Sequence, residues 1–194
     1  MSLFERRFIM LISKFNTNQI ESEVSKFEQQ QGIILPVQYR SFLVRYNGGF
    51  TPETDFCTEN ESSDIRAFYG INSEAYSFSK LNLKKWLSKK LLPIACDSFG
   101  NMIVISLDDK TGCVYFCNHE KKFAKTKLAN DFKGFISCCK SEAMDESYYW
   151  TVEEREQSMI KDGLGKMVTD ELRQMWQEEY EQNLKMHQEE VVLD

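Results

Sequence analysis

The chain has 194 residues, a net charge of −6 and 42% hydrophobic residues, which is enough apolar material for one domain with a core. No apolar run is long enough to cross a bilayer and no signal-peptide pattern is present, so we expect a cytoplasmic protein that binds no membrane. Six cysteines without a Cys-x-x-Cys pair favour free thiols over a disulfide framework.

Charge divides the chain into two parts. Residues 1–140 contain 19 basic and 15 acidic side chains, whereas residues 141–194 contain 5 and 15. We therefore predict a domain over 1–140 with a net charge of +4 and an acidic helical C-terminal extension over 141–194 with a net charge of −10. The extension is either an interaction element or a solvated helical appendage.

Helical signals dominate the first fifty residues. Apolar residues at helical spacing predict a short amphipathic helix over 4–15, and Asn18 with Glu21 has the spacing of a capping box for a second helix that ends at Gly32. A third helix begins near Pro36, whose ring suits a first turn, and ends at Asn47-Gly48-Gly49, residues that can adopt left-handed backbone.

A turn-rich acidic segment follows over residues 50–64. It contains no Lys or Arg and five carboxylates, at Glu53, Asp55, Glu59, Glu61 and Asp64. Such a segment is either a docking surface for a basic partner or a solvated loop.

The sequence pattern in the middle of the chain predicts strands interrupted by one helix. Residues 65–71 predict a strand, and Asn72 or Ser73 is a candidate cap for a helix whose lysines form a solvent-exposed stripe. Residues 94–95, 102–107 and 113–120, separated by glycine-containing turns, predict a three-stranded antiparallel meander. A basic loop is expected over 121–127, and Asp131 is a candidate cap for the last helix of the domain.

The acidic extension has two helical segments. Thr151 is a candidate cap for the first, and Thr169 or Asp170 begins the second. Three aromatic side chains are candidate anchors for a partner: Tyr148, Trp150 and Trp176.

Cys117 and His119 are the strongest candidates for chemistry because alternation places both on one strand face. A zinc site needs further ligands, and a thiol hydrolase needs an oriented base and an oxyanion hole. The sequence has no phosphate-binding glycine loop and no His-Glu-x-x-His pair, so we predict no enzyme, no cofactor and no metal site.

The order of capped helix, Gly, Leu-Pro, second helix and Asn-Gly-Gly resembles the SUKH superfamily, which includes Smi/Knr-type cell-wall-assembly regulators of fungi and many bacterial immunity proteins. The resemblance spans roughly residues 18–139 and is carried by IESEVSKFEQQQGIILPVQYRSFLVRYNGG, IRAFYGI and LPIACDSFGNMIVISLDDKTGCVYFCNHE. It implies an α+β, SUKH-like single domain in which N-terminal helices pack on a mainly antiparallel sheet. We interpret the shared motif residues as fold-specifying: Leu35, Pro36, Tyr39, Asn47, Gly48, Gly49, Gly100 and Asn101.

The resemblance also implies a binding function. The first hypothesis is an immunity protein that neutralises a cognate toxin, expected to be a basic nuclease, by covering its active or substrate-binding surface. The second is an intracellular scaffold related to cell-wall assembly signalling. A partner-binding surface would combine Glu53, Asp55, Glu59, Glu61 and Asp64 with Tyr148, Trp150 and Trp176.

Overall fold

The computed structural model describes residues 9–15, 19–108, 111–184 and 186–193. Contacts divide the chain into a body, Met1–Glu142 with Gln188–Asp194, and a helical unit, Ala143–His187. The last residues therefore group with the body, whereas the sequence analysis assigned all of 141–194 to the extension. The reason is a short strand near the end of the chain, which no local sequence pattern predicts.

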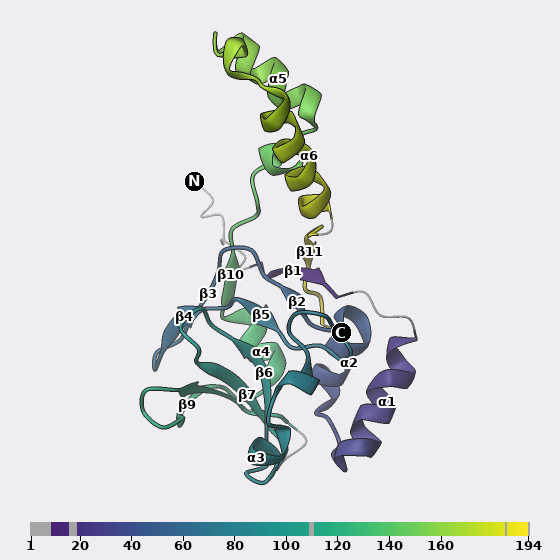
Figure 1. Ribbon diagram of the computed structural model, residues 1–194. Helices are drawn as coiled ribbons and strands as arrows, with labels where there is room; N and C mark the ends of the chain where they lie inside the picture. The colour runs from purple at the N-terminus through teal and green to yellow at the C-terminus, as the bar shows by residue number, and fades with distance from the viewer. Residues whose placement is uncertain (1–8, 16–18, 109–110, 185, 194) are drawn as a thin grey trace, which may run out of the picture. The chain divides into compact units, whose positions relative to one another are not determined.

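The body is built on an antiparallel sheet (Figure 1). Its strand order is β11-β1-β2-β5-β6-β7-β8-β9. The bounds are β11 Glu189–Glu190, β1 Leu11–Lys14, β2 Gly49–Phe50, β5 Ala67–Phe68, β6 Leu91–Cys96, β7 Met102–Ser106, β8 Val114–Asn118 and β9 Ala124–Ala129. A second, three-stranded sheet has the order β10-β3-β4, with β10 Cys139–Ser141, β3 Thr54–Cys57 and β4 Ser62–Asp64. The predicted α+β class with mainly antiparallel pairing is confirmed.

The predicted meander is present as β6, β7 and β8. β7 lies between the other two, and its residues 103–106 are buried, as its nearly continuous apolar sequence predicts. The basic loop expected over 121–127 is wrong from Ala124 onward, because β9 pairs with β8 there. β9 is an edge strand, where lysines can stay solvated; the ammonium of Lys125 lies 4.6 Å from the ring centroid of Tyr115.

Helices α1 (Ile20–Gln31) and α2 (Val37–Tyr46) agree with the prediction. Gly32 and Asn47 end them in left-handed backbone, with φ of 62° and 53°. α4 (Phe132–Ser137) begins where predicted, since the Asp131 carboxylate accepts the Gly134 N–H at 2.7 Å. Aromatic rings from α2, β5 and α4 form the centre of the core: Tyr39, Phe42, Tyr46, Phe68 and Phe132.

The expected helix over 4–15 is wrong for its second half, which forms β1. Leu11 and Ile12 pair with β11 on one side of the strand, and Ser13 and Lys14 pair with β2. Hydrogen bonds to residues far away in sequence thus override a local helical pattern. Residues 4–8 and Asn18 lie outside the described residues; α1 begins after Gln19, which makes no side-chain capping bond.

The helix predicted to begin at Asn72 or Ser73 is also replaced, by bends and two shorter helical elements. Asn72 has left-handed backbone (φ 55°), and the chain passes through bends to a 3₁₀ turn, η1 (Phe78–Lys80), and a short helix, α3 (Leu83–Leu87). The Phe78 ring stacks on Phe27 of α1 with 4.9 Å between the ring centroids, so packing on the core stabilises this segment.

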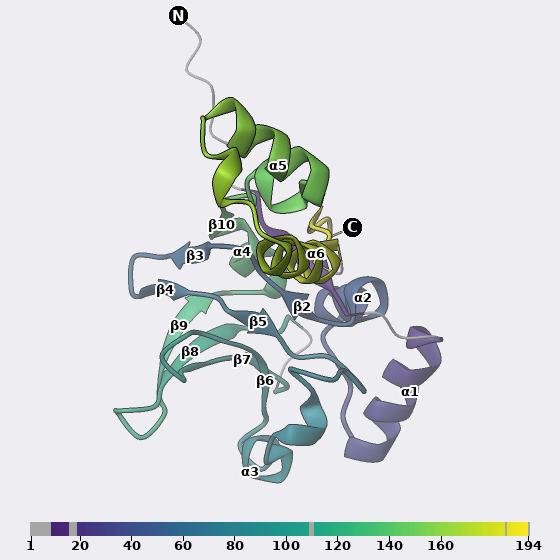
Figure 2. The same ribbon diagram turned by 45° about the horizontal axis from the view of Figure 1, so that its top comes forward.

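The helical unit contains η2 (Glu146–Tyr149), α5 (Val152–Lys161), η3 (Gly165–Met167) and α6 (Asp170–Leu184). Thr151 starts α5 as predicted and forms a capping box with Glu154. α5 ends in a Schellman motif: the Leu164 N–H donates to the Met159 carbonyl at 2.8 Å, and the Gly163 N–H donates to the Ile160 carbonyl at 3.0 Å. α5 and α6 run alongside each other (Figure 2), and none of the described helices is long and apolar enough to cross a membrane.

Candidate protein-interaction surfaces

The acidic segment of residues 50–64 forms a hairpin of β3 and β4 instead of an irregular loop. Thr58 organises its turn: the Thr58 hydroxyl accepts the N–H groups of Asn60 and Glu61 at 3.3 and 3.1 Å. The Asn60 side chain donates to the Lys127 carbonyl of β9 at 3.3 Å. The structure therefore holds the predicted carboxylates of this segment on one ordered element.

Strand register places two of these carboxylates opposite each other. Asp55 pairs with Asp64 on β4 and with Lys140 on β10. Alternation directs Thr54 and Phe56 into the core and Asp55 to the exposed face, together with Glu53 just before the strand. Like charges directly opposite each other in a sheet are unfavourable, and Lys140 on the other neighbouring strand offsets part of this repulsion at Asp55.

A rigid turn next to this hairpin presents an exposed aromatic ring. The buried Asp97 carboxylate accepts the N–H groups of Phe99 and Asn101 at 3.0 and 2.7 Å and the Asn101 amide at 2.6 Å. Its other contact is the Ser63 hydroxyl at 2.9 Å, which joins the turn to β4. Phe99 at the tip is 72% exposed. The turn is therefore ordered before any partner binds, so that binding costs little conformational entropy.

The hairpin and the turn border an open groove of about 540 Å³. It is lined by Asp55, Phe56, Cys57, Ser62, Ser63, Asp64, Ser98 and Phe99. Asp64 links the two elements, because its carboxylate accepts the Ser98 N–H at 3.1 Å. We call this surface, with Glu53, Glu59 and Glu61, the acidic face. Sequence reasoning missed Phe99, although a lone aromatic residue inside an Asp-Ser-Phe-Gly-Asn turn is a usable signal.

The three predicted aromatic anchors lie together in the helical unit around a pocket of about 350 Å³. Tyr148 and Trp150 are 52% and 38% exposed, whereas Trp176 of α6 is only 9% exposed. The Asn183 amide donates to the Tyr148 carbonyl at 2.8 Å and holds η2 against α6. Arg155 of α5, also in the lining, bonds Glu179 of α6 at 2.6 Å.

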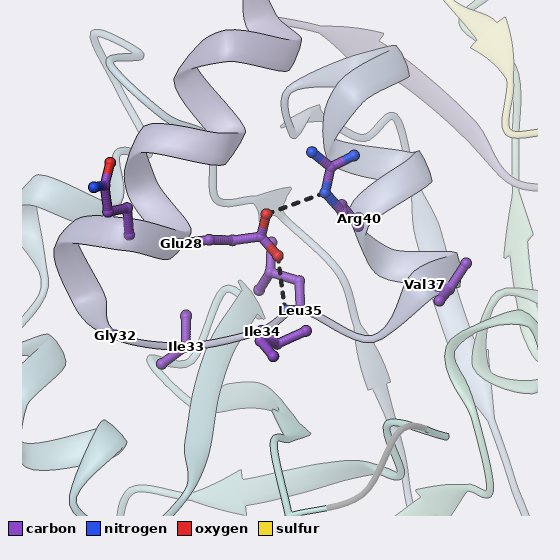
Figure 3. A pocket seen from close by; sticks show the side chains of 8 residues that line it. Glu28, Gly32, Ile33, Ile34, Leu35, Val37 and Arg40 are labelled. Atoms are coloured by element: carbon purple, nitrogen blue, oxygen red, sulfur yellow. Dashed lines mark hydrogen bonds and ion pairs between the residues drawn. The ribbon is translucent and has the colours of Figure 1, made fainter.

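A third surface lies at the elbow between α1 and α2 (Figure 3). The Glu28 carboxylate accepts the Leu35 N–H at 2.9 Å and the Arg40 Nε–H at 3.1 Å, so one side chain fixes the connection between the helices. The same elbow leaves Ile34 and Val37 exposed at 86% and 74%. Two large apolar side chains in solvent on a well-braced element indicate a contact surface.

Cys117 lies on β8, but the strand ends at Asn118 and His119 is in the following turn, so the prediction that both share one strand face is wrong. The environment of Cys117 also does not suit a nucleophile. Cys117 is fully buried beside Trp86, Leu91 and Val104, and this burial raises the pKa of its thiol to about 11. The His119 Nδ1 lies 2.8 Å from the Asn101 Oδ1. Among the described residues, no group of three or more His, Cys, Asp or Glu side chains is arranged to hold a metal ion.

The body residues that flank the helical unit in sequence bond to the same short segment of the body, residues 9–10. The Ser141 N–H donates to the Ile9 carbonyl at 2.9 Å, and the Val191 N–H donates to the Met10 carbonyl at 2.8 Å. Because successive carbonyls of an extended chain point in opposite directions, the two attachments lie on opposite edges of this segment. Residues 143–187 are therefore an insertion between two body strands rather than a free tail.

Comparison with known proteins agrees with this architecture. Residues 21–138 match the SMI1 / KNR4 family (SUKH-1). A Bacillus subtilis (strain 168) protein described as SPbeta prophage-derived uncharacterized protein YokK is 25% identical over 145 residues, which cover 62% of this chain and 73% of the relative. No solved structure matches the chain significantly. The family match covers more than half of the chain and contains both helices, the acidic face and the meander, so this protein belongs to the SMI1/KNR4 (SUKH-1) family.

Proposed function

We propose that the chain is an immunity protein that binds a cognate protein toxin and neutralises it by covering the toxin's active or substrate-binding surface. Family membership makes a protein partner the first expectation, since SUKH domains are commonly immunity proteins. The observation that carries the proposal is the acidic face, where Asp55 and Asp64 line the same groove as the exposed ring of Phe99.

The chemistry of the acidic face favours a basic partner, and we propose a nuclease domain. Five carboxylates lie within residues 53–64 without a Lys or Arg among them. A nuclease must attract phosphates, so its substrate groove is positively charged, and an inhibitor gains encounter rate and complementarity from concentrated negative charge. Phe99 would supply the apolar anchor that charge alone does not provide.

The helical unit supplies a second set of candidate contacts. It has eleven acidic and five basic residues, so its net charge of −6 has the same sign as the acidic face. Its pocket is lined by the partly exposed side chains of Tyr148 and Trp150 and by the largely buried side chain of Trp176. Tyr and Trp at the edge of a defined pocket are typical of residues that dominate binding energy in protein interfaces.

On this proposal the protein acts in the cytoplasm as a stoichiometric inhibitor, with no catalytic group, no cofactor and no direct contact with nucleic acid or membrane. Burial keeps the Cys117 thiol protonated, which supports assigning this residue no catalytic role.

The alternative is an intracellular scaffold related to cell-wall assembly signalling. A scaffold needs surfaces for at least two partners, and the exposed Ile34 and Val37 at the α1–α2 elbow offer an apolar surface distinct in chemistry from the acidic face. This elbow is the specific observation that keeps the alternative open.

Affinity purification from the protein's own host, followed by binding measurements with the captured protein, tests the two functions. The perturbed variant carries Asp55→Lys and Glu59→Lys, two exposed charges of the acidic face. The matched control carries Glu21→Lys and Glu74→Lys, which change the net charge equally at exposed positions outside it. Immunity predicts one near-stoichiometric basic protein that is toxic when expressed alone and harmless when co-expressed with this chain.

The control variant should bind that toxin normally, and the acidic-face variant should associate slowly, with the difference shrinking at high salt. Equal association of both variants at low salt would remove the acidic face from the interface. Capture of several non-toxic signalling or cell-wall-synthesis proteins instead would favour the scaffold.

A further inference from the structure

Two cysteines of the body lie opposite each other at one end of the ladder between β3 and β10 in the three-stranded sheet. The register of β3 with β10 pairs Phe56 with Cys139, and one step further along the ladder Cys57 is opposite Cys138. The Cys57 N–H donates to the Cys138 carbonyl at 3.2 Å, so the two backbones meet at the end of this ladder, where Cys138 ends α4 just before β10 begins. Residues opposite each other on antiparallel strands have Cα atoms about 4.5–5.5 Å apart, inside the range of about 4.4–6.8 Å that disulfides span.

Both side chains are accessible. Phe56 is fully buried, so alternation along β3 turns Cys57 away from the core, whereas Cys138 ends α4 in helical backbone and is partly exposed. Cys57 is exposed and Cys138 is partly buried, and both are free thiols. Burial, with a smaller effect from the neighbouring Cys57, raises the pKa of Cys138.

We propose that Cys57 and Cys138 form a modification site, a dithiol that closes to a disulfide on reaction with a peroxide or a low-molecular-weight disulfide. This inference does not depend on the function proposed above. Cys57 reacts first because it is exposed, whereas the Cys138 thiol donates to the Gly134 carbonyl at 3.3 Å at the end of α4. Cys138 then resolves the first product.

The chemistry balances with hydrogen peroxide as the oxidant. The Cys57 thiolate takes one oxygen from the peroxide, the O–O bond breaks, hydroxide leaves, and Cys57 becomes a sulfenic acid. The Cys138 sulfur then attacks the Cys57 sulfur, the S–O bond breaks, and the oxygen leaves as water with the thiol proton. The dithiol loses two electrons and peroxide is reduced to water. With glutathione disulfide, two successive exchanges release two glutathione thiols.

The remaining cysteines are poor competitors. Cys96, Cys117 and Cys139 are buried, and burial raises the pKa of each thiol, which lowers its thiolate fraction. Cys113 is partly exposed and serves as the matched control, because its removal leaves the Cys57–Cys138 pair intact.

The test treats the full-length protein with hydrogen peroxide, and separately with glutathione disulfide. Remaining thiols are alkylated at low pH, and peptides are mapped by mass spectrometry without reduction. We expect one intramolecular crosslink, Cys57 to Cys138, reversed by dithiothreitol and unchanged in Cys113→Ser. In Cys138→Ser the crosslink is lost, and Cys57 accumulates as a glutathione adduct or a dimedone-reactive sulfenic acid. In Cys57→Ser no crosslink forms and Cys138 stays reduced.

Two results would overturn the proposal. One is wild-type protein whose Cys57 carries glutathione while Cys138 remains alkylated, which would show that the second step does not occur. The other is a crosslink that persists in Cys57→Ser, which would place the reactive pair elsewhere. Circular dichroism of each serine variant checks that the fold is retained, so that loss of the crosslink reports chemistry rather than unfolding.

Discussion

Two tyrosines on α2 provide a matched test of how polar groups behave in this core. Both rings are almost fully buried, but their hydroxyls differ. The Tyr46 hydroxyl accepts the Val192 N–H at 2.8 Å and donates to the Glu190 carbonyl at 3.2 Å, tying the C-terminal strand to the helix. The Tyr39 hydroxyl has no hydrogen-bond partner among the described residues. Burial raises the pKa of Tyr39 strongly, so this hydroxyl stays neutral.

Tyr→Phe at the two positions should therefore change stability in opposite directions. Tyr46→Phe removes two hydrogen bonds and leaves a backbone N–H without its acceptor, at a cost of about 1–2 kcal/mol. Tyr39→Phe removes an unsatisfied buried dipole and leaves the packing nearly unchanged, so we expect a gain of about 1 kcal/mol. For a chain of this size, 1 kcal/mol corresponds to roughly 2–4 °C in Tm.

Thermal and urea unfolding, followed by circular dichroism, measures the stability change of both variants. Hydrogen exchange at the Val192 amide localises the effect of Tyr46→Phe. Tyr46→Phe should speed exchange at that amide, whereas Tyr39→Phe should leave it unchanged. The reasoning is refuted if Tyr39→Phe lowers Tm as much as Tyr46→Phe does, because the Tyr39 hydroxyl would then have to be satisfied in the folded protein.

Three further predictions concern the backbone and the insertion. Gly48→Ala should prevent stable folding, because a Cβ there would lie 2.6 Å from two backbone carbonyl oxygens. Gly100 has open space around it, so Gly100→Ala should cost only about 1 kcal/mol of stability, for its positive φ. Expression level and Tm distinguish the two variants. Replacing 143–187 with a Gly/Ser linker of about six residues should leave the body folded, whereas ending the chain at Ser141 should lower its Tm, because only truncation removes β11. Thr151→Ala should cost about 0.5–2 kcal/mol through loss of the capping box, measured as the unfolding free energy of the helical unit.

The pH dependence of that helical unit has a defined sign. The hydrogen bonds from Thr151 lower the pKa of Glu154, so the folded unit prefers the carboxylate. Its stabilising effect is present above the unfolded pKa and is lost as the pH falls through the lower, folded pKa. An acid titration of α5 helicity should therefore show a larger loss in wild type than in Glu154→Gln, in which Glu156, whose pKa is lowered by its bond to Arg173, still contributes; an identical titration of both would contradict it.

The insertion also changes how binding experiments should be designed. A chain cut at Ser141 loses Val191, which is buried in the core, and the backbone partners of Tyr46. Loss of a partner from such a truncation would not distinguish a missing interface from a damaged body. The linker replacement described above separates these two causes.

Local signals in the sequence determined most helix ends. Gly32, Asn47, Asp131 and Thr151 act through hydrogen bonds or backbone conformations within a few residues of themselves, so each was readable from sequence. The meander was readable for the same reason, since glycine-containing turns separate short runs of strand-forming residues. Charge segregation likewise needs no structure, and it pointed to the acidic segments that form the proposed partner-binding surfaces.

Only the tertiary structure decided which segments without a strand pattern of their own are paired into the sheet. β1 pairs Leu11 with Glu190, and β9 carries lysines that resemble a loop; strands of this kind are held by partners elsewhere in the chain and leave no periodic pattern of their own. The exposure of Phe99 and the pairing of Cys57 with Cys138 also depend on which strands become neighbours. Sequence thus determined what hydrogen bonds and contacts within a few residues can specify, and the tertiary structure decided what depends on which segments become neighbours, from Asp64 with Ser98 to Leu11 with Glu190.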